Sequence, residues 1–179
     1  MATTADGYGM AQWQGKTALV TGASNGIGAA LAGRLLREGM NVVGCARRQN
    51  RVAEVLAAVD TSGQNSLAVE CDVRDEKSVQ KAFTDARERF GGVHVLINNA
   101  GLGHADSLAD GKVDEWREML DVNVLGLCIC TREALADMRS RGDRGHIIHI
   151  GSMAGQRVPA GAGLYAATKH AVRALTESL

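Results

Sequence analysis

Tyr165 and Lys169 are the residues of this sequence whose types and spacing point most directly to proton chemistry. They stand at positions i and i+4, so on a helix they lie on one face. A lysine ammonium beside a phenol favours the phenolate, because a nearby opposite charge stabilises the ionised form. The pair could therefore exchange a proton near neutral pH, as a general acid or base does. The alternative is an ordinary Tyr-x-x-x-Lys pair on an exposed helix.

Ser152 and Asn123 are polar residues that could act with this pair. Ser152 comes just after a predicted strand, where a hydroxyl can face a ligand cleft. Asn123 lies within a long predicted helical region. Taken singly, a serine after a strand is common, and a helical asparagine can be a kink or a polar contact. All four residues are present, in the order Asn, Ser, Tyr, Lys, after a glycine-rich loop. Their occurrence together argues against a chance combination of unrelated residues.

That glycine-rich loop follows the first predicted strand and opens a helix. Its glycines let the backbone turn tightly and approach a pyrophosphate, whose charge meets free N–H groups and the positive helix end. The alternative is an ordinary turn, but the strand, turn and helix context is the one that nucleotide binding requires. We expect cofactor contacts from Gly22, Ser24, Asn25, Gly26, Ile27 and Gly28.

Arginines replace the acidic residue that many dinucleotide sites carry after the second strand. An acid at this place binds the ribose hydroxyls of NAD, whereas arginine can meet the 2′-phosphate of NADP. Residues 39–53 contain no acid but include Arg47, Arg48 and Arg51. Such a cluster can give a phosphate two or three charge-assisted hydrogen bonds. We expect NADP(H) as the cofactor, held by Arg47 and Arg48; the alternative is that these arginines are only solvated.

The elements that must position these residues alternate along the chain. Runs such as Thr-Ala-Leu-Val are apolar on both faces, which is typical of strands buried in a parallel sheet. We expect strands at 17–20, 41–45, 66–69, 93–97 and 146–150, and helices at 24–37, 51–59, 75–90, 114–139 and 164–179. This alternation predicts an α/β fold with a doubly wound, Rossmann-like parallel sheet of about five strands.

The composition is that of one ordinary globular domain. The 179 residues include 20 Lys plus Arg and 20 Asp plus Glu, so the formal net charge is zero. No positive field favours nucleic acid, and no apolar run is long enough to span a membrane. The N-terminal stretch lacks the basic and apolar regions of a signal peptide. We expect a cytoplasmic protein with a flexible segment at residues 1–14 and a dinucleotide-binding domain at residues 15–179.

No metal site is expected. The four cysteines are spread without the spacing of a zinc site or a disulfide framework, and Cys128 and Cys130 point to different helix faces. His146 and His149 are three apart on a predicted strand and so face opposite sides. His104, in the loop after the fourth strand, is expected at the surface or in packing, and the alternative is a place in a pocket.

The motif Thr-Gly-x-x-x-Gly-Ile-Gly, followed by Tyr-x-x-x-Lys, resembles the short-chain dehydrogenase/reductase family. The glycine spacing differs from that of the extended, sugar-epimerase-like branch, which disfavours an epimerase. Residues 44–48, 121–125 and 129–134 are most similar to the animal NADP-dependent 17-beta-hydroxysteroid and carbonyl reductase or farnesol dehydrogenase branch. The resemblance extends from residue 14 to residue 179.

The resemblance implies roles for residues at matching positions. Asn123, Ser152, Tyr165 and Lys169 correspond to the catalytic tetrad of the family, and Tyr165 and Lys169 would also contact the cofactor. The expected contacts to adenine come from Asp72 and Val73, although Asp72 alone could equally cap the next helix. A wall of the cofactor site is expected from the segment after the fourth strand, at Asn98, Asn99, Ala100 and Gly101.

The implied activity is hydride transfer between nicotinamide and a carbonyl or secondary alcohol, with the cofactor supplying the hydride. Met153, Val158 and Leu164 flank the tyrosine without a charged clamp, so we expect an apolar substrate such as a steroid or isoprenoid. Arg157 lies in the same loop and weakens that expectation.

Family members continue beyond the last predicted helix with two more strand and helix units, so the C-terminal strands are expected to be absent. The family commonly forms dimers and tetramers through the long helix and the last helix, so a homo-oligomer is expected if the fold is complete. The alternative to an active enzyme is a truncated, non-catalytic nucleotide-binding fragment. The two hypotheses differ in turnover rather than in cofactor binding.

Overall fold

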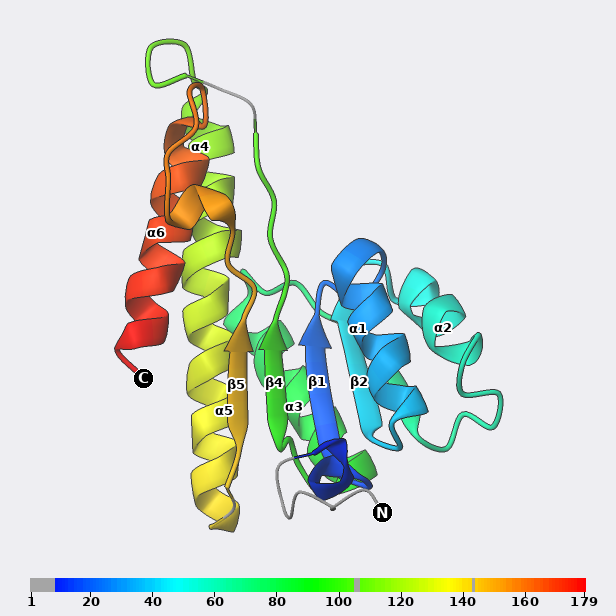
Figure 1. Ribbon diagram of the computed structural model, residues 1–179. Coiled ribbons are helices and arrows are strands. Elements are labelled where there is room, and N and C mark those ends of the chain that lie inside the picture. Colours follow the sequence, from blue (N-terminus) through cyan, green and yellow to red (C-terminus); the bar gives the residue numbers. More distant parts are fainter. Residues whose placement is uncertain (1–8, 105–106, 143) are drawn as a thin grey trace, which may run out of the picture.

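The computed structural model describes residues 9–104, 107–142 and 144–179, and its sheet consists of parallel strands (Figure 1). The strands are β1 (Thr17–Thr21), β2 (Asn41–Ala46), β3 (Ser66–Glu70), β4 (Val95–Asn98) and β5 (His146–His149). Their order is β3-β2-β1-β4-β5, with Thr17 paired to Asn41 and Ala18 to Val95. The chain moves outward from β1 in both directions, which confirms the predicted doubly wound α/β sheet.

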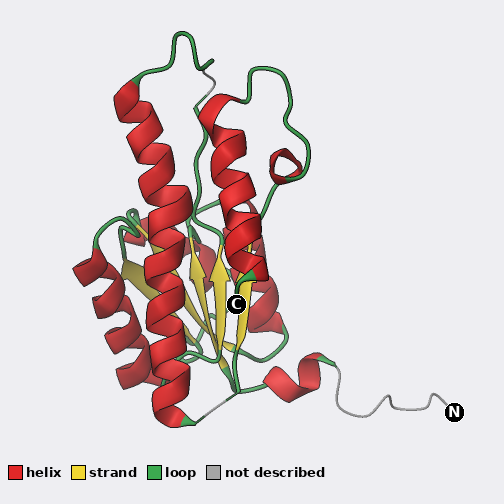
Figure 2. Cartoon of the chain, turned by 90° about the vertical axis from the view of Figure 1, so that its left-hand side faces the viewer, coloured by secondary structure: helices red, strands yellow, loops and turns green. Residues whose placement is uncertain are grey.

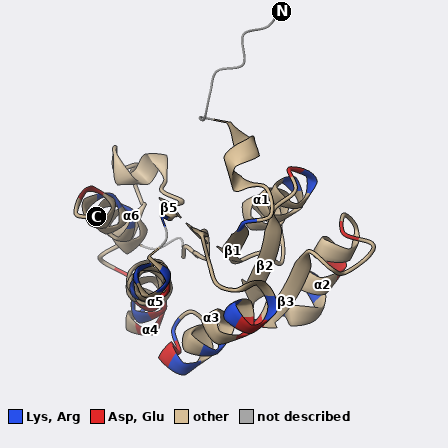
Figure 3. Cartoon of the chain, turned by 90° about the horizontal axis from the view of Figure 1, so that it is seen from below, with Lys and Arg blue, Asp and Glu red and all other residues tan. Residues whose placement is uncertain are grey.

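Helices cover both faces of the sheet. One apolar cluster joins the sheet to α1 (Gly26–Arg37) and α2 (Gln49–Ala57), and the other joins it to α3 (Glu76–Phe90) and α5 (Leu127–Arg141). Figure 3 shows α1 on one side of the strands and α3 with α5 on the other. All residues of β1 are buried, as expected for a central strand with both faces covered.

The predicted long helical region is continuous but changes its winding in the middle. It consists of α4 (Val113–Leu120), a π-helical turn η2 (Asp121–Gly126) and α5. A Cβ on Gly126 would lie 2.8 Å from Cγ2 of Val73, so the helix approaches the end of β3 more closely than a side chain would allow. This approach brings η2 to the carboxyl ends of the strands, where single-turn π segments often occur at functional sites.

The last helix, α6 (Gly163–Glu177), runs beside the long helix (Figures 1 and 2). Asn123 Nδ2 donates a hydrogen bond to Thr168 Oγ1 at 3.1 Å, which joins η2 to α6. His149 Nδ1 lies 3.0 Å from Thr176 Oγ1 and joins β5 to the same helix. These bonds fix the helix that carries Tyr165 and Lys169 against the sheet.

Part of the predicted flexible segment is packed. Residues Met10–Trp13 form a short 3-10 helix, η1, and Trp13 contacts the apolar cluster beneath α1. The packed chain therefore starts before the expected boundary at residue 15, because the indole adds apolar surface to that cluster. Residues 1–8 lie outside the described residues.

Candidate active site

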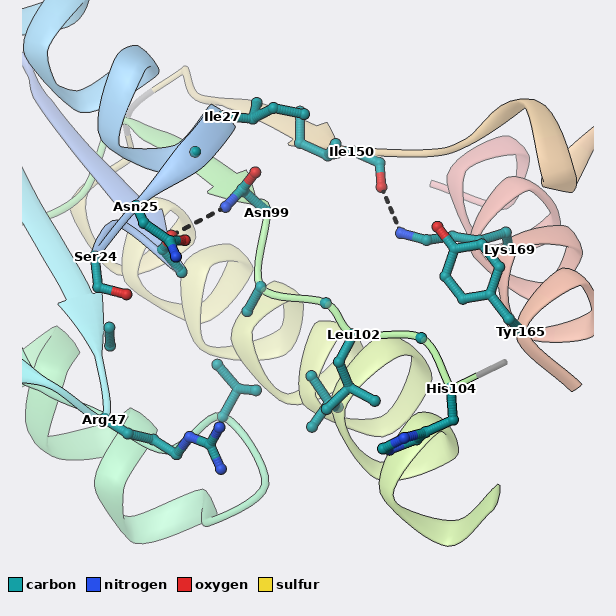
Figure 4. Close-up of a pocket in the computed structure, with 18 of the residues that line it drawn as sticks. Ser24, Asn25, Ile27, Arg47, Asn99, Leu102, His104, Ile150, Tyr165 and Lys169 are labelled. Carbon is teal, nitrogen blue, oxygen red and sulfur yellow. Dashed lines mark hydrogen bonds between the residues drawn. The ribbon is translucent and has the colours of Figure 1, made fainter. Parts of the chain in front are cut away.

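The carboxyl ends of the strands open into a cavity of about 800 Å³, a size typical of ligand sites. Figure 4 shows Ser24 and Arg47 at one end of it and Tyr165 and Lys169 at the other. Most of the predicted site residues line it, namely Gly22, Ser24, Asn25, Gly26, Ile27, Arg47, Arg48, Asp72, Val73, Asn99, Ala100, Gly101, Tyr165 and Lys169. Gly28, Asn123 and Ser152 do not.

The glycine-rich loop has a backbone that requires glycine at defined places. Gly22 has a φ of +69°, and a Cβ there would lie 2.9 Å from Asn99 Nδ2. A Cβ on Gly28 would collide with the carbonyl oxygen of Gly22. The lack of a side chain on Gly28 lets α1 approach the loop that lines the cavity; the predicted contact of Gly28 with the cofactor stays a prediction.

Side-chain hydrogen bonds tie the loop after β1 to the loop after β4. Thr21 Oγ1 accepts hydrogen bonds from the backbone N–H groups of Asn99 and Ala100, both at 3.0 Å. Asn99 Nδ2 donates to the carbonyl oxygens of Thr21, at 2.9 Å, and Gly22, at 3.3 Å. Two walls of the cavity are therefore held in a fixed relation before any ligand binds.

The N-terminus of α1 fits a pyrophosphate. Asn25 stands at the N-cap, and its side chain makes no capping hydrogen bond. The N–H groups of a first helical turn lack intrahelical partners and carry the positive end of the helix dipole. Residues 24–27 line the cavity, and a side chain on Gly22 would crowd Asn99 and Ala100 in the loop after β4. These donors and this space suit the phosphates of a dinucleotide.

Arg47 and Arg48 line the cavity at the carboxyl end of β2. Within the described ranges, neither side chain has an ion pair or a hydrogen bond, and both residues are exposed. Arg51, by contrast, pairs with Glu54 at 3.0 Å and does not line the cavity. Two uncommitted guanidinium groups at one end of a nucleotide-sized cavity suit an additional phosphate.

Asp72 lines the cavity and is already engaged by a neighbouring arginine. Arg74 Nη2 donates to Asp72 Oδ2 at 2.6 Å, and Arg74 Nε donates to Oδ1 at 3.0 Å. The hydrogen bonds from Arg74 lower the pKa of Asp72, and the charge of Arg47 adds to the effect. Asp72 does not cap the next helix: α3 begins after Asp75, whose side chain accepts from Lys77 N.

Tyr165 and Lys169 come from the first two turns of α6. Nζ of Lys169 lies 5.9 Å from the centre of the Tyr165 ring, and Figure 4 shows the phenol and the ammonium directed to the same part of the cavity. Lys169 is buried, and its Nζ donates to the carbonyl oxygen of Ile150 at 3.0 Å. Burial disfavours the charged form and lowers the pKa of Lys169.

Asn123 and Ser152 lie beside the cavity rather than in its wall. The Asn123 amide is buried and exchanges hydrogen bonds with the backbone of Leu102: Oδ1 accepts from N at 2.9 Å, and Nδ2 donates to O at 2.8 Å. Ser152 Oγ accepts from Ala154 N at 3.1 Å at the start of η3 (Met153–Gly155). Gly151 lines the cavity in its place.

Other lining residues were not predicted. Leu102, Gly103 and His104 follow β4, and Val122 and Ala162 add apolar surface. His104 was expected at the surface or in packing, with a pocket as the alternative, and it lines the cavity, with Nε2 lying 3.0 Å from Glu118 Oε2. Its place after β4, at the strand end where such sheets bind ligands, was the available signal.

Asn98 and the residues expected to flank the tyrosine do not line the cavity either. The Asn98 amide is buried and donates to Thr131 Oγ1 at 2.9 Å, so it supports the wall from behind. Met153 and Val158 are largely exposed, and Leu164 is half-buried. The apolar lining near the tyrosine comes instead from Leu102 and Ala162.

Neither a metal centre nor a membrane span is found in the parts of the chain that the structure describes. No group of three or more His, Cys, Asp and Glu residues there could hold a metal ion. No described helix is both long and apolar enough to cross a bilayer.

Comparison with known proteins agrees with this geometry. Residues 16–179 match the family described as short chain dehydrogenase. "Dehydrogenase/reductase SDR family member 11" of Bos taurus is 47% identical over 175 residues, which are 95% of this chain and 69% of that protein. "Farnesol dehydrogenase" of Aedes aegypti is 45% identical over 175 residues, covering 95% of this chain and 71% of its own length.

Solved structures share the fold. A short chain dehydrogenase/reductase from Burkholderia phymatum in complex with NAD is 34% identical with a TM-score of 0.89, over 93% of this chain and 59% of that one. An actinorhodin polyketide ketoreductase with NADPH is 33% identical with a TM-score of 0.86, over 91% of this chain and 63% of that one. The chain thus spans less than two thirds of these two structures. By its sequence match, its sheet and its cavity, this chain belongs to the short-chain dehydrogenase family.

Proposed function

We propose that this protein is an NADP(H)-dependent oxidoreductase that transfers hydride between nicotinamide and a carbonyl or secondary alcohol of an apolar substrate. The observation that carries the proposal is one cavity of about 800 Å³ that joins the glycine-rich loop, Arg47 and Arg48, and the Tyr165 and Lys169 pair. Each of these groups suits a different part of the reaction: phosphate binding, recognition of a 2′-phosphate, and proton transfer.

The preference for NADP(H) is supported by the two arginines. Solved relatives include one in complex with NAD and one with NADPH, so family membership alone does not choose between them. A 2′-phosphate beside Arg47 and Arg48 would gain charge-assisted hydrogen bonds from side chains that have no other ion pair in the described chain. An acidic residue, the usual partner of the NAD ribose, is absent from residues 39–53.

The proposed chemistry divides between the cofactor and the chain. The bound cofactor supplies or accepts the hydride. In the reductive direction, Tyr165 donates a proton to the carbonyl oxygen, and the Lys169 ammonium favours the phenolate that remains. Ser152 adjoins Gly151, which lines the cavity, and its Oγ accepts from Ala154 N, so its own O–H is free to donate; we assign this O–H to the same carbonyl oxygen. Asn123 acts through the backbone that it holds.

The substrate class is supported by the apolar lining and by one relative. Leu102, Val122 and Ala162 line the cavity beside the polar groups. The relative from Aedes aegypti is a farnesol dehydrogenase, whose named substrate is an apolar alcohol. We include a homo-oligomeric assembly and a cytoplasmic location in the proposal; both rest on the family resemblance and on the composition.

The Tyr165→Phe variant tests the proposal. It should keep its affinity for NADPH, because only the hydroxyl is lost, but it should lose most of its NADPH oxidation with a carbonyl panel that includes farnesal and a ketosteroid. General acid–base catalysis contributes about 100-fold to 10,000-fold to a rate. Tyr8→Phe is the matched control and should behave as the unaltered chain does.

Two results would count against the proposal. Normal turnover by Tyr165→Phe with intact NADPH binding would exclude the tyrosine as the acid. NADPH binding by the unaltered chain without turnover of any carbonyl would favour the alternative of a non-catalytic nucleotide-binding protein.

A further inference from the structure

Thr168 connects the helix of the proposed acid to the loop that faces it. It lies one turn after Tyr165 on α6 and is 1% exposed. Its Oγ1 donates a hydrogen bond to the backbone carbonyl of Tyr165 at 2.7 Å and accepts one from Asn123 Nδ2 at 3.1 Å. Thr168 therefore touches the backbone of the tyrosine on one side and the amide of Asn123 on the other.

The hydrogen bonds fix the orientation of the Asn123 amide. The Thr168 hydroxyl proton is committed to Tyr165 O, so Thr168 can only accept from Asn123. The NH₂ group must then face Thr168. Its second hydrogen is donated to Leu102 O, which lies 2.8 Å from Nδ2. Asn123 Oδ1 is left to accept from Leu102 N at 2.9 Å. A flipped amide would break all three bonds, so the Thr168 hydroxyl stabilises the same amide orientation that the Leu102 backbone requires.

The loop held by Asn123 returns to the tyrosine ring. Gly103 follows Leu102, and a Cβ on Gly103 would lie 3.0 Å from Cδ2 of Tyr165. The backbone of Gly103 therefore packs against the ring itself. The contacts form a closed path, which we call the positioning circuit: Tyr165, Thr168, Asn123, Leu102, Gly103 and back to the ring of Tyr165.

We propose that Thr168 is a positioning residue for Tyr165 and that it acts through this circuit. It does not line the cavity, so it fixes the ring by holding the Leu102–Gly103 loop against it. The catalytic part of the inference rests on the proposed function, in which Tyr165 donates the proton. The structural part does not, because it concerns only where the ring lies.

The chain allows a direct measurement of the ring. It contains two tyrosines, Tyr8 and Tyr165, so a Tyr8→Phe background leaves Tyr165 as the single tyrosine. Biosynthetic incorporation of meta-fluorotyrosine then gives a fluorine NMR signal from Tyr165 alone, without cofactor or substrate. Loss of turnover and displacement of the ring can thus be measured separately.

Thr168→Val removes the hydroxyl at nearly constant volume, whereas Thr168→Ser keeps it. We expect the valine variant to shift or split the fluorine resonance and the serine variant to retain the signal of the unaltered residue. Thr84→Val is the matched control, because Thr84 Oγ1 also donates to a helix carbonyl, that of Gln80 at 3.0 Å, but is exposed on α3. It should leave the resonance unchanged.

Gly103→Ala tests the opposite end of the circuit without removing a hydrogen bond. Its added methyl group should displace the ring and shift the same resonance, so the test stands even if Thr168→Val does not fold. With an active substrate, both variants should lower kcat about 10-fold to 100-fold with little change in NADPH affinity, because a small misplacement of a reacting group suffices.

An unchanged fluorine resonance in folded Thr168→Val, or in Gly103→Ala, would overturn the inference. A shift equal in the valine and serine variants would also overturn it, because the hydroxyl would then not be the cause. Failure of the unaltered chain to bind or oxidise NADPH would instead refute the proposed function and leave the ring measurement valid.

Discussion

Lys169 places a positive charge where water is largely excluded. The residue is 8% exposed, and the acceptor of its Nζ is the carbonyl oxygen of Ile150. Burial lowers the pKa of Lys169, because the ammonium loses its hydration. A buried cation beside a tyrosine in a cavity is unfavourable for folding, and such groups concentrate at functional sites.

This burial predicts how stability changes with pH. The unfolded chain holds the Lys169 proton up to its ordinary pKa of 10.5, whereas the folded chain releases it at lower pH. Between these two values the unfolded state binds more protons, so rising pH favours the folded state. At pH values below both pKa values, Lys169 is charged in the folded chain, and burial of the ammonium lowers the free energy of unfolding by its full amount.

The measurement is urea unfolding of the unaltered chain and of Lys169→Met at a series of alkaline pH values. The free energy of unfolding of the unaltered chain should rise relative to that of the variant as the pH approaches about 10.5. A difference that stays constant or falls over this window would contradict the burial effect.

Residue types and local spacing predicted the cavity residues whose positions follow from one loop or one helix. The Gly22–Ile27 loop and the Tyr165 and Lys169 pair belong to this class, since strand end and helical period decide where they lie. Ser152 makes a local contact as well, since its Oγ accepts from Ala154 N two residues further along. Asn123 and Gly28 differ, because hydrogen bonds or close packing with other segments decide where these residues face. Such contacts cannot be derived from spacing along the chain.

Asp137 illustrates how the elements around the sheet are joined. Its carboxylate is buried on α5, where Oδ1 accepts from Arg87 Nε of α3 at 3.1 Å. Oδ2 accepts from Val93 N at 2.8 Å and from Arg141 Nη2 at 3.2 Å. One side chain thus links two helices and the segment that leads into β4.

Asp137→Ala should lower the free energy of unfolding by about 3 to 5 kcal/mol, because it leaves buried donors and charge without their acceptor. Chemical denaturation followed by circular dichroism measures the change. Asp114→Ala is the control: its pair with Arg117 is exposed on both sides, so the denaturation midpoint should hardly move. Equal effects of the two substitutions would contradict the role given to Asp137.

The types of the predicted strands and helices are confirmed, and contacts between elements explain the shifted boundaries. The helix expected from residue 24 begins at Gly26, because Asn25 is still extended, with a φ of −164°. The strand expected from residue 93 begins at Val95, and Val93 N is bonded to Asp137. The short helices η1 and η3 have only four and three residues, too few to give a periodic signal.

The cavity lies where all five strands of the described sheet end. Its nucleotide end comes from the loops after β1, β2 and β3, and its reaction end comes from the loops after β4 and β5 and from α6. Hydrogen bonds between Thr21 and the Asn99–Ala100 backbone join the two ends. If the proposed function holds, we expect substitutions at the loops after β1, β2 and β3 to change cofactor affinity, and substitutions on α6 to change turnover.

The chain covers 69% of its bovine relative and 59% of a solved relative, so turnover must be measured on this chain itself. The most direct measurement is a fluorescence titration with NADPH and with NADH, on the unaltered chain and on a double variant, Arg47→Ala with Arg48→Ala, followed by addition of the carbonyl panel.

We expect NADPH to bind at least about tenfold more tightly than NADH, since one hydrogen bond to a charged group contributes about 1.5 to 3 kcal/mol. The double variant should lose that preference while keeping its affinity for NADH, and carbonyl addition should oxidise NADPH bound to the unaltered chain. Equal affinity for the two nucleotides, or a preference that survives in the double variant, would show that Arg47 and Arg48 do not recognise the 2′-phosphate. No oxidation of bound NADPH would contradict the proposed oxidoreductase activity.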